Sequence, residues 1–200
     1  YTLSPHDALP IFDDHTGKIS PSGQTIGTST SYTFLINADD FTAKDMTVRN
    51  DAGIHAGQAV GVDIRGDKAA FIHCNIIGDQ DSLVAQSPAS REFYKDCYIE
   101  GTTDFIFGAA TAFFDRCRIH CKINSHITAA STPQDHPFGF VFSRCIITGD
   151  SGVTRADLGR PWGDYAAVVF LHCNIGHCIA PYGWSNWHDT QRDKTARYAE

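Results

Sequence analysis

Five of the seven cysteines share one local pattern, with an aromatic residue three positions before the cysteine and an isoleucine two positions after it. The five copies span residues 71–76, 94–99, 114–119, 142–147 and 170–175. A sixth segment, 41–46, keeps the frame with Lys44 in the cysteine position and Met46 in the isoleucine position. The copies recur every 20 to 30 residues. This spacing predicts stacked structural units rather than one closed sheet.

Each copy predicts a short strand, with a bend between the aromatic residue and the cysteine. The cysteine and the isoleucine lie two residues apart, so on a strand they point to the same face, whereas the aromatic residue is out of phase. The chain has 18 Ile, 8 Val and 13 Phe against 6 Leu, which suits strands and excludes a helical bundle. We therefore expect an all-β fold, a right-handed parallel β-helix in the form of a single-stranded solenoid, with internal ladders of cysteine and isoleucine.

A metal site is the competing interpretation of the cysteines. A histidine directly precedes a cysteine at His73, His120, His172 and His177. Structural zinc sites usually show paired short spacings, whereas these cysteines recur with the hydrophobic ladder and the histidines alternate to the opposite side of the strand. We expect the cysteines to belong to the core and to bind no metal. Cys121 and Cys178 fall outside the ladder.

Charge and hydropathy restrict the classes of partner. The formal net charge is -7, from 16 basic and 23 acidic residues, which argues against a nucleic-acid partner. An acidic polymer could still bind through a local site. No stretch approaches the roughly 20 consecutive apolar residues that a membrane span requires.

Two aspartates occupy equivalent positions in successive copies. Asp81 and Asp104 each follow a ladder cysteine by seven residues, in the pattern I-x-G-x-x-D followed by an apolar pair. Equal offsets predict carboxylates stacked about 5 Å apart, the distance between strands. Such a pair titrates in coupled steps, which provides one anionic nucleophile or base and one protonated acid. The alternative is a pair of turn aspartates beside Gly78 and Gly101.

Three further segments carry groups that such a pair needs. Arg160, followed by Pro161 and Trp162, could hold one aspartate ionised, and the indole could stack on a sugar. Gln58 and Gln80 are uncharged amide donors that could polarise an ester carbonyl. The alternative for each is an exposed loop or an ordinary surface amide.

The same residues stand in five ordered blocks. The blocks are Gln58-Ala-Val, Gly78-Asp-Gln-Asp81-Ser-Leu, Gly101-Thr-Thr-Asp104-Phe-Ile-Phe-Gly108, Leu158-Gly-Arg160-Pro-Trp162 and Gly183-Trp-Ser-Asn-Trp187. Their order and types resemble the signature blocks of the pectin methylesterases (pectinesterases), over a region from about Gly27 to Glu200. The resemblance implies a right-handed parallel β-helix that hydrolyses the methyl esters of galacturonate in homogalacturonan. It also implies that methanol is released without a metal or an organic cofactor.

The resemblance assigns roles to individual residues. Asp104 matches the nucleophile, and Asp81 matches the acid that protonates methanol and then the base that activates water. Gln58 and Gln80 match the oxyanion stabilisers, and Arg160 matches the residue that hydrogen-bonds the nucleophile and keeps it ionised. The implied substrate-binding residues are Gln58, Phe107, Arg160, Trp162 and Thr103. The implied partner is pectin, bound by a monomer that is secreted to the extracellular space or the cell wall.

Three positions depart from the family pattern. Asp79 stands where the family often has Tyr, Val84 where an aromatic residue is common, and Ala109 where Asn is frequent. These departures keep two alternatives open. One is a catalytically weak β-helix that binds polysaccharide, and the other is a family member that acts on a non-pectin ester.

The ends of the chain also depart from the pattern. The first coils that the family would place before Gly27 are missing, and the sequence stops at Glu200 where the family continues. Residues 1–12 fit neither the repeat nor the family. We therefore expect residues 1–12 to be a non-native leader and residues 13–200 to be a partial β-helix domain, truncated at both ends.

Overall fold

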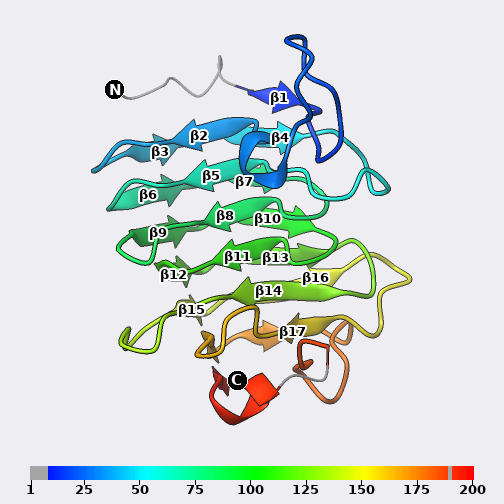
Figure 1. Ribbon diagram of the computed structural model, residues 1–200. Coiled ribbons are helices and arrows are strands. Elements are labelled where there is room, and N and C mark those ends of the chain that lie inside the picture. The colour runs from blue at the N-terminus through cyan, green and yellow to red at the C-terminus, as the bar shows by residue number, and fades with distance from the viewer. Residues whose placement is uncertain (1–8, 189–190) are drawn as a thin grey trace.

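The chain winds into stacked coils of three short strands each, so that three parallel sheets run along the length of the molecule (Figure 1). The computed structural model describes residues 9–188 and 191–200. Within them, no helix is long and apolar enough to cross a membrane. All ladders between the described strands are parallel, and the expected β-helix is confirmed.

The strands follow one another in register from coil to coil. The first sheet has the order β1 (Ile11–Phe12), β4 (Thr47–Asn50), β7 (Asn75–Ile77), β10 (Tyr98–Gly101), β13 (Arg118–Cys121), β16 (Ile146–Gly149) and β19 (Asn174–Ile175). The second has the order β17 (Asp157–Gly159), β14 (His126–Ala130), β11 (Ile106–Gly108), β8 (Leu83–Ala85), β5 (Val62–Ile64) and β2 (Phe34–Ile36). The third has the order β20 (Arg197–Ala199), β18 (Ala167–Leu171), β15 (Phe140–Ser143), β12 (Thr111–Asp115), β9 (Arg91–Lys95), β6 (Ala69–Ile72) and β3 (Thr42–Lys44). The 3-10 helices are η1 (Thr28–Thr30) and η2 (Gln191–Lys194).

The internal ladders are those that the repeat predicts. Ile76 pairs with Ile99, Ile99 with Ile119, and Ile119 with Ile147, all in the first sheet. The aromatic residues stack from coil to coil, with ring centroids 4.5 Å apart for Tyr94 and Phe114 and 4.4 Å apart for Phe114 and Phe142. The bend between ring and cysteine is a residue with positive φ directly before each ladder cysteine: His73, Asp96, Arg116, Arg144 and His172. These bends join the third sheet of one coil to the first sheet of the next.

The predicted frame of the sixth copy is wrong. The structure pairs Ala43 with Phe71 and Val48 with Ile76, so Met46 rather than Lys44 takes the cysteine position. Asp45 supplies the positive-φ bend before it, and Lys44 is exposed. Burial decides the frame here, because Met46 is 5% exposed and a lysine in that position would place its charge inside the core.

Four of the five ladder cysteines are buried core residues, and Cys173 is partly buried against the core. Each thiol from Cys97 to Cys173 lies within 3.4 to 3.5 Å of the carbonyl of the aromatic residue one coil below, and donates a weak hydrogen bond to it. Cys121 and Cys178 are also buried core residues. Both flank Gly149, which pairs with Cys121 and whose missing side chain leaves room for Cys178.

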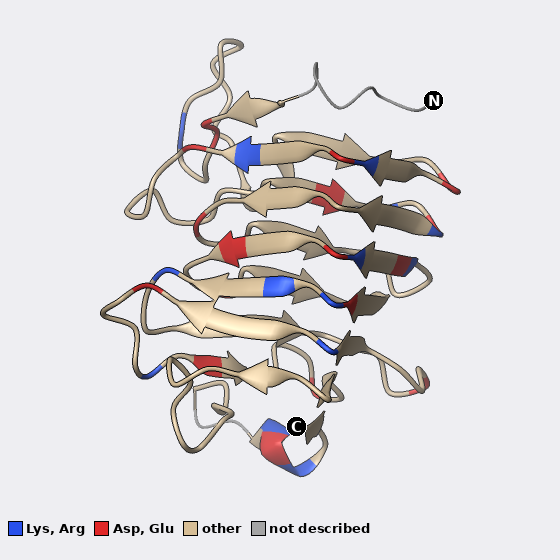
Figure 2. Ribbon diagram, turned by 180° about the vertical axis from the view of Figure 1, so that it is seen from behind, with Lys and Arg blue, Asp and Glu red and all other residues tan. Residues whose placement is uncertain are grey.

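Most of the predicted leader lies outside the described residues, because the structure describes none of residues 1–8. Ile11 and Phe12, which the prediction also assigned to the leader, form β1 and pair with Arg49 and Asn50. The boundary at residue 12 therefore stays a prediction. Figure 2 shows acidic and basic residues interspersed along the strands and turns.

Candidate active site

The two aspartates of equal offset lie on adjacent coils. Leu83 of β8 pairs with Ile106 of β11, and Asp81 and Asp104 stand two residues before these partners. Both lie at bends with positive φ, 67° for Asp81 and 50° for Asp104, a conformation that aspartate tolerates better than most residues. The bend turns the chain from the first sheet into the second. It therefore places both carboxyl groups at the edge of the second sheet, one strand spacing apart.

Arg160 holds Asp104 in a two-pronged ion pair. The Nε atom of Arg160 donates to Oδ1 of Asp104 at 3.0 Å and an Nη atom donates to Oδ2 at 2.7 Å. Asp104 is 7% exposed and the Arg160 side chain 17%, so water screens the pair only weakly. The ring of Trp187 lies 4.0 Å from the Arg160 guanidinium. An ionised carboxylate fits this fork, because both of its oxygens accept hydrogen bonds from a fixed cation.

Asp81 has the opposite electrostatic environment. Burial, followed by the nearby charge of Asp104, raises the pKa of Asp81 to about 8, although Gln58 and Arg160 act against the shift. The side chain is therefore protonated at neutral pH. The two carboxyl groups therefore lie in unequal environments, one buried and one in an ion pair.

The amides line the same cavity as the carboxyl groups. A cavity of about 270 Å³ is bounded by Gln58, Gln80, Asp81, Asp104, Phe107, Ala129, Arg160, Trp162 and Trp187. Gln58 and Gln80 lie side by side in a parallel bridge. The structure thus brings together five predicted catalytic residues and two predicted sugar contacts that are up to about 100 positions apart in the sequence.

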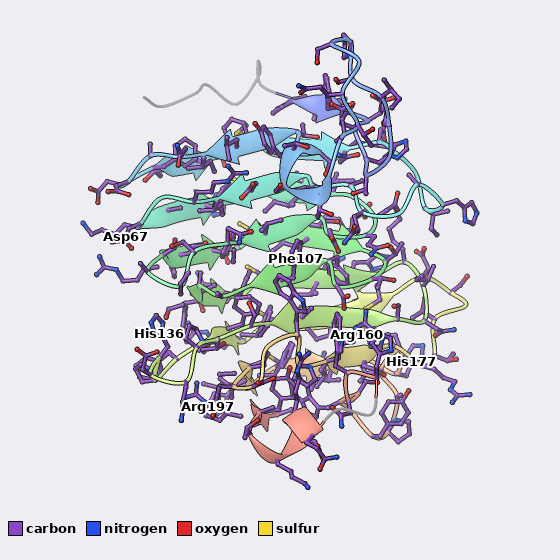
Figure 3. All side chains as sticks on the ribbon, in the orientation of Figure 1. Asp67, Phe107, His136, Arg160, His177 and Arg197 are labelled. Atoms are coloured by element: carbon purple, nitrogen blue, oxygen red, sulfur yellow. The ribbon has the colours of Figure 1, made fainter. Side chains whose placement is uncertain are left out.

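A second cavity of about 370 Å³ extends the first along the outer face of the second sheet. It shares Gln58, Phe107 and Trp162 with the first and adds Thr28, Ser29, Asp63, Val84 and Gln86. The rings of Phe107 and Trp162 meet edge to face at 5.8 Å. Phe107 and Arg160 project over the same face of the molecule (Figure 3). The two cavities form a groove with the carboxyl groups at one end and an apolar floor beside them.

One predicted substrate contact lines neither of these cavities, and one residue that the prediction missed does line the site. Thr103 lines neither cavity, and its hydroxyl hydrogen-bonds Ser125 at 2.8 Å. Trp187 does line the site, and the sequence signalled it only as the last residue of the Gly183 to Trp187 block. Among the described residues, no group of three or more His, Cys, Asp or Glu side chains could hold a metal ion.

Comparison with known proteins places this arrangement in a family. The pectinesterase family model matches residues 15–200. The chain belongs to the pectinesterase family. It is 36% identical over 203 residues to pectinesterase 31 of Arabidopsis thaliana, covering 99% of this chain and 63% of that protein. The chain therefore spans less than two thirds of the length of that relative.

Solved structures of pectin methylesterases have the same fold. The carrot enzyme matches with a TM-score of 0.83 and 30% identity, over 96% of this chain and 62% of its own. A pectin methylesterase in complex with a hexasaccharide matches with a TM-score of 0.80 and 25% identity, over 96% of this chain and 71% of its own.

The departures from the pectinesterase pattern have structural explanations at two positions. Asp79 is buried, and its carboxylate pairs with Lys122 at 2.5 Å, so it does not stand as an unpaired charge beside Asp81. Lys122 also donates to the carbonyl of Gly78 at 3.1 Å. Val84 packs with Val60, Phe107 and Ala129 on the groove floor. An aliphatic side chain thus fills this part of the floor.

Proposed function

We propose that this chain is the catalytic part of a pectin methylesterase, which hydrolyses the methyl esters of galacturonate units in homogalacturonan. The observation that carries the proposal is the unequal pair of carboxyl groups. Asp104 lies in the fork of Arg160, and Asp81, one coil away, keeps its proton at neutral pH. Membership of the pectinesterase family supports the choice of substrate.

In the proposed first step, the Asp104 carboxylate attacks the carbonyl carbon of the methyl ester. The negative charge that develops on the carbonyl oxygen is stabilised by the amide groups of Gln58 and Gln80. Asp81 gives its proton to the methoxy oxygen as the bond from carbon to that oxygen breaks. Methanol leaves, and an anhydride joins Asp104 to the sugar carboxyl group.

The second step returns the site to its starting state. Asp81, now ionised, takes a proton from water as the water oxygen attacks the carbonyl carbon of the anhydride. The bond to Asp104 breaks, which releases a galacturonate carboxylic acid group and restores the Asp104 carboxylate. Arg160 stabilises that carboxylate as it leaves. Every proton is carried by Asp81 or water, so the proposed cycle uses no cofactor.

The groove gives the proposal a place for a chain of sugars. Phe107 and Trp162 border both cavities, and aromatic rings pack well against the apolar faces of sugars. We expect further sugars of the chain to occupy the second cavity. The proposed substrate is a cell-wall polymer, so we also expect a protein secreted to the extracellular space or cell wall. The monomeric state stays a prediction.

Methanol release from methyl-esterified pectin tests the proposal. The wild-type protein should release methanol, and Asp104→Asn should lower kcat at least about 10³-fold because the amide cannot act as the nucleophile. Asp96→Asn is the matched control, because Asp96 forms a similar two-pronged pair with Arg116 on the surface, at 2.9 and 3.1 Å. This control should keep its activity.

Each alternative has its own outcome in the same experiment. A folded wild-type protein that binds pectin but releases no methanol is a polysaccharide-binding β-helix, and the proposal is then wrong. Release of acid from small acyl esters without methanol from pectin identifies an esterase with a non-pectin substrate. Equal activities of wild type and Asp104→Asn would overturn the assignment of the nucleophile.

A further inference from the structure

The role proposed for Gln58 depends on the orientation of its side-chain amide. A glutamine amide has a carbonyl oxygen that accepts hydrogen bonds and an NH₂ group that donates them, and the two are nearly identical in shape. Only the NH₂ group can stabilise an oxyanion, whereas the oxygen in its place would repel it. A residue that fixes the orientation of Gln58 therefore acts on the reaction through the glutamine.

Thr28 contacts the oxygen end of this amide. Its Oγ1 atom donates a hydrogen bond to Oε1 of Gln58 at 2.8 Å. With Oε1 held in this way, Nε2 faces the opposite side, toward Asp81. The hydrogen bond from Gln58 that acts to lower the pKa of Asp81 is consistent with this direction. The hydroxyl of Thr28 also meets that of Thr16 at 3.2 Å.

The segment that carries Thr28 is anchored to the coil of Gln58 at several points. The amide of Thr16 donates to the carbonyl of Gln58 at 2.9 Å. After η1, the hydroxyl of Ser31 accepts a hydrogen bond from the amide of Val60 at 3.1 Å. The segment from Thr16 to Ser31 is therefore hydrogen-bonded to the backbone of both Gln58 and Val60. These bonds hold Thr28 at a fixed distance from the glutamine side chain.

We propose that Thr28 is a positioning residue of the oxyanion site: its hydroxyl fixes the amide of Gln58 so that Nε2 faces the ester carbonyl. This role rests on the proposed esterase function. Because Thr28 also borders the second cavity, the contact lies between the ester site and the place of the neighbouring sugar. Loss of the hydroxyl leaves Gln58 free to present its oxygen to the substrate for part of the time.

The test compares Thr28→Val, which keeps the shape and removes the hydroxyl, with Thr28→Ser, which keeps the hydroxyl. Removal of a whole oxyanion donor lowers kcat about 10² to 10³-fold, so partial misorientation should cost Thr28→Val about 10-fold in kcat. KM should change less than about 2-fold, since the defect lies in the transition state. Thr28→Ser should recover kcat to within about 2-fold of the wild type.

A double-mutant cycle separates positioning from a general structural effect. In a Gln58→Ala background there is no amide to orient, so adding Thr28→Val should lower kcat no further. Thr30→Val is the matched control, because this residue lies on the same 3-10 helix and its hydroxyl bonds to Gly27 at 3.0 and 3.1 Å rather than to Gln58. Its kcat should match that of the wild type.

The outcomes distinguish this inference from the proposed function. A folded wild-type protein without methanol release overturns the proposed function and this role with it. An active wild type whose Thr28→Val variant keeps its kcat overturns only the role of Thr28. Equal losses from Thr28→Val in the wild-type and Gln58→Ala backgrounds also overturn it, because the effect then does not pass through Gln58.

Discussion

The buried acid Asp81 should make the protein less stable as the pH rises, and Asp81→Asn should remove this effect. The pKa of Asp81 is raised from 3.8 to about 8, by burial first and then by the charge of Asp104. Between these two values the unfolded chain has lost the proton and the folded protein keeps it. Folded protein therefore binds more protons than unfolded protein, and stability falls with increasing pH.

The size of the effect follows from the interval between the two pKa values. Each pH unit between about 4 and about 8 lowers the free energy of unfolding by about 1.4 kcal/mol, so the accumulated loss at pH 7 is about 4 kcal/mol. The asparagine variant has nearly the same shape and no proton to lose. Relative to the wild type, it should gain stability steadily over this range, by an amount approaching about 4 kcal/mol at pH 7.

Urea denaturation followed by tryptophan fluorescence measures this difference at a series of pH values from 4.5 to 7.5. Asp40→Asn is the control, because the Asp40 side chain is 70% exposed, and its effect should stay within about 0.5 kcal/mol at every pH. A difference between wild type and Asp81→Asn that is the same at pH 4.5 and pH 7 would refute the reasoning. In that case Asp81 would not be the protonated partner of the pair.

Two further predictions concern the ion pair and the core. Arg160→Lys keeps the charge but loses the two-pronged fork on Asp104, so kcat for methanol release should fall about 10 to 10²-fold; an unchanged kcat would show that charge alone suffices. Ile119→Ala removes a fully buried ladder side chain and should lower the free energy of unfolding by about 2 to 5 kcal/mol in urea denaturation. Ile146→Ala, at a position 42% exposed, should cost less than about 0.5 kcal/mol, and equal losses at both positions would contradict the ladder assignment.

The repeat predicted the fold because a solenoid uses the same local solution in every coil. A ring, a bend, a cysteine and an isoleucine recur together, and the register of Ile99 with Ile76 and Ile119 follows from that recurrence. The first described coil departs from this pattern, since Met46 replaces the cysteine and Ala43 the aromatic residue. The frame predicted there was wrong because it was set by Phe41, which lies two residues before the equivalent position at Ala43.

The part of the candidate site that lies within the repeat could be predicted in the same way as the fold. Asp81 and Asp104 could be stacked by their equal offsets, and the family resemblance supplied distinct roles for them. The partner of Asp79 could not be predicted, because Lys122 comes from another coil with a different loop length. The same holds for the stacking of Trp187 on Arg160.

The sequence by itself determined the coil, its internal ladders and the position of two carboxyl groups on adjacent coils, because these depend on local spacing repeated along the chain. Only the tertiary structure decided which groups surround those carboxyl groups. The fork of Arg160 on Asp104 and the bond from Thr28 to Gln58 join segments 56 and 30 residues apart. Contacts of this kind depend on how loops of unequal length return to one face of the helix, and the unequal environments of Asp81 and Asp104 follow from that packing.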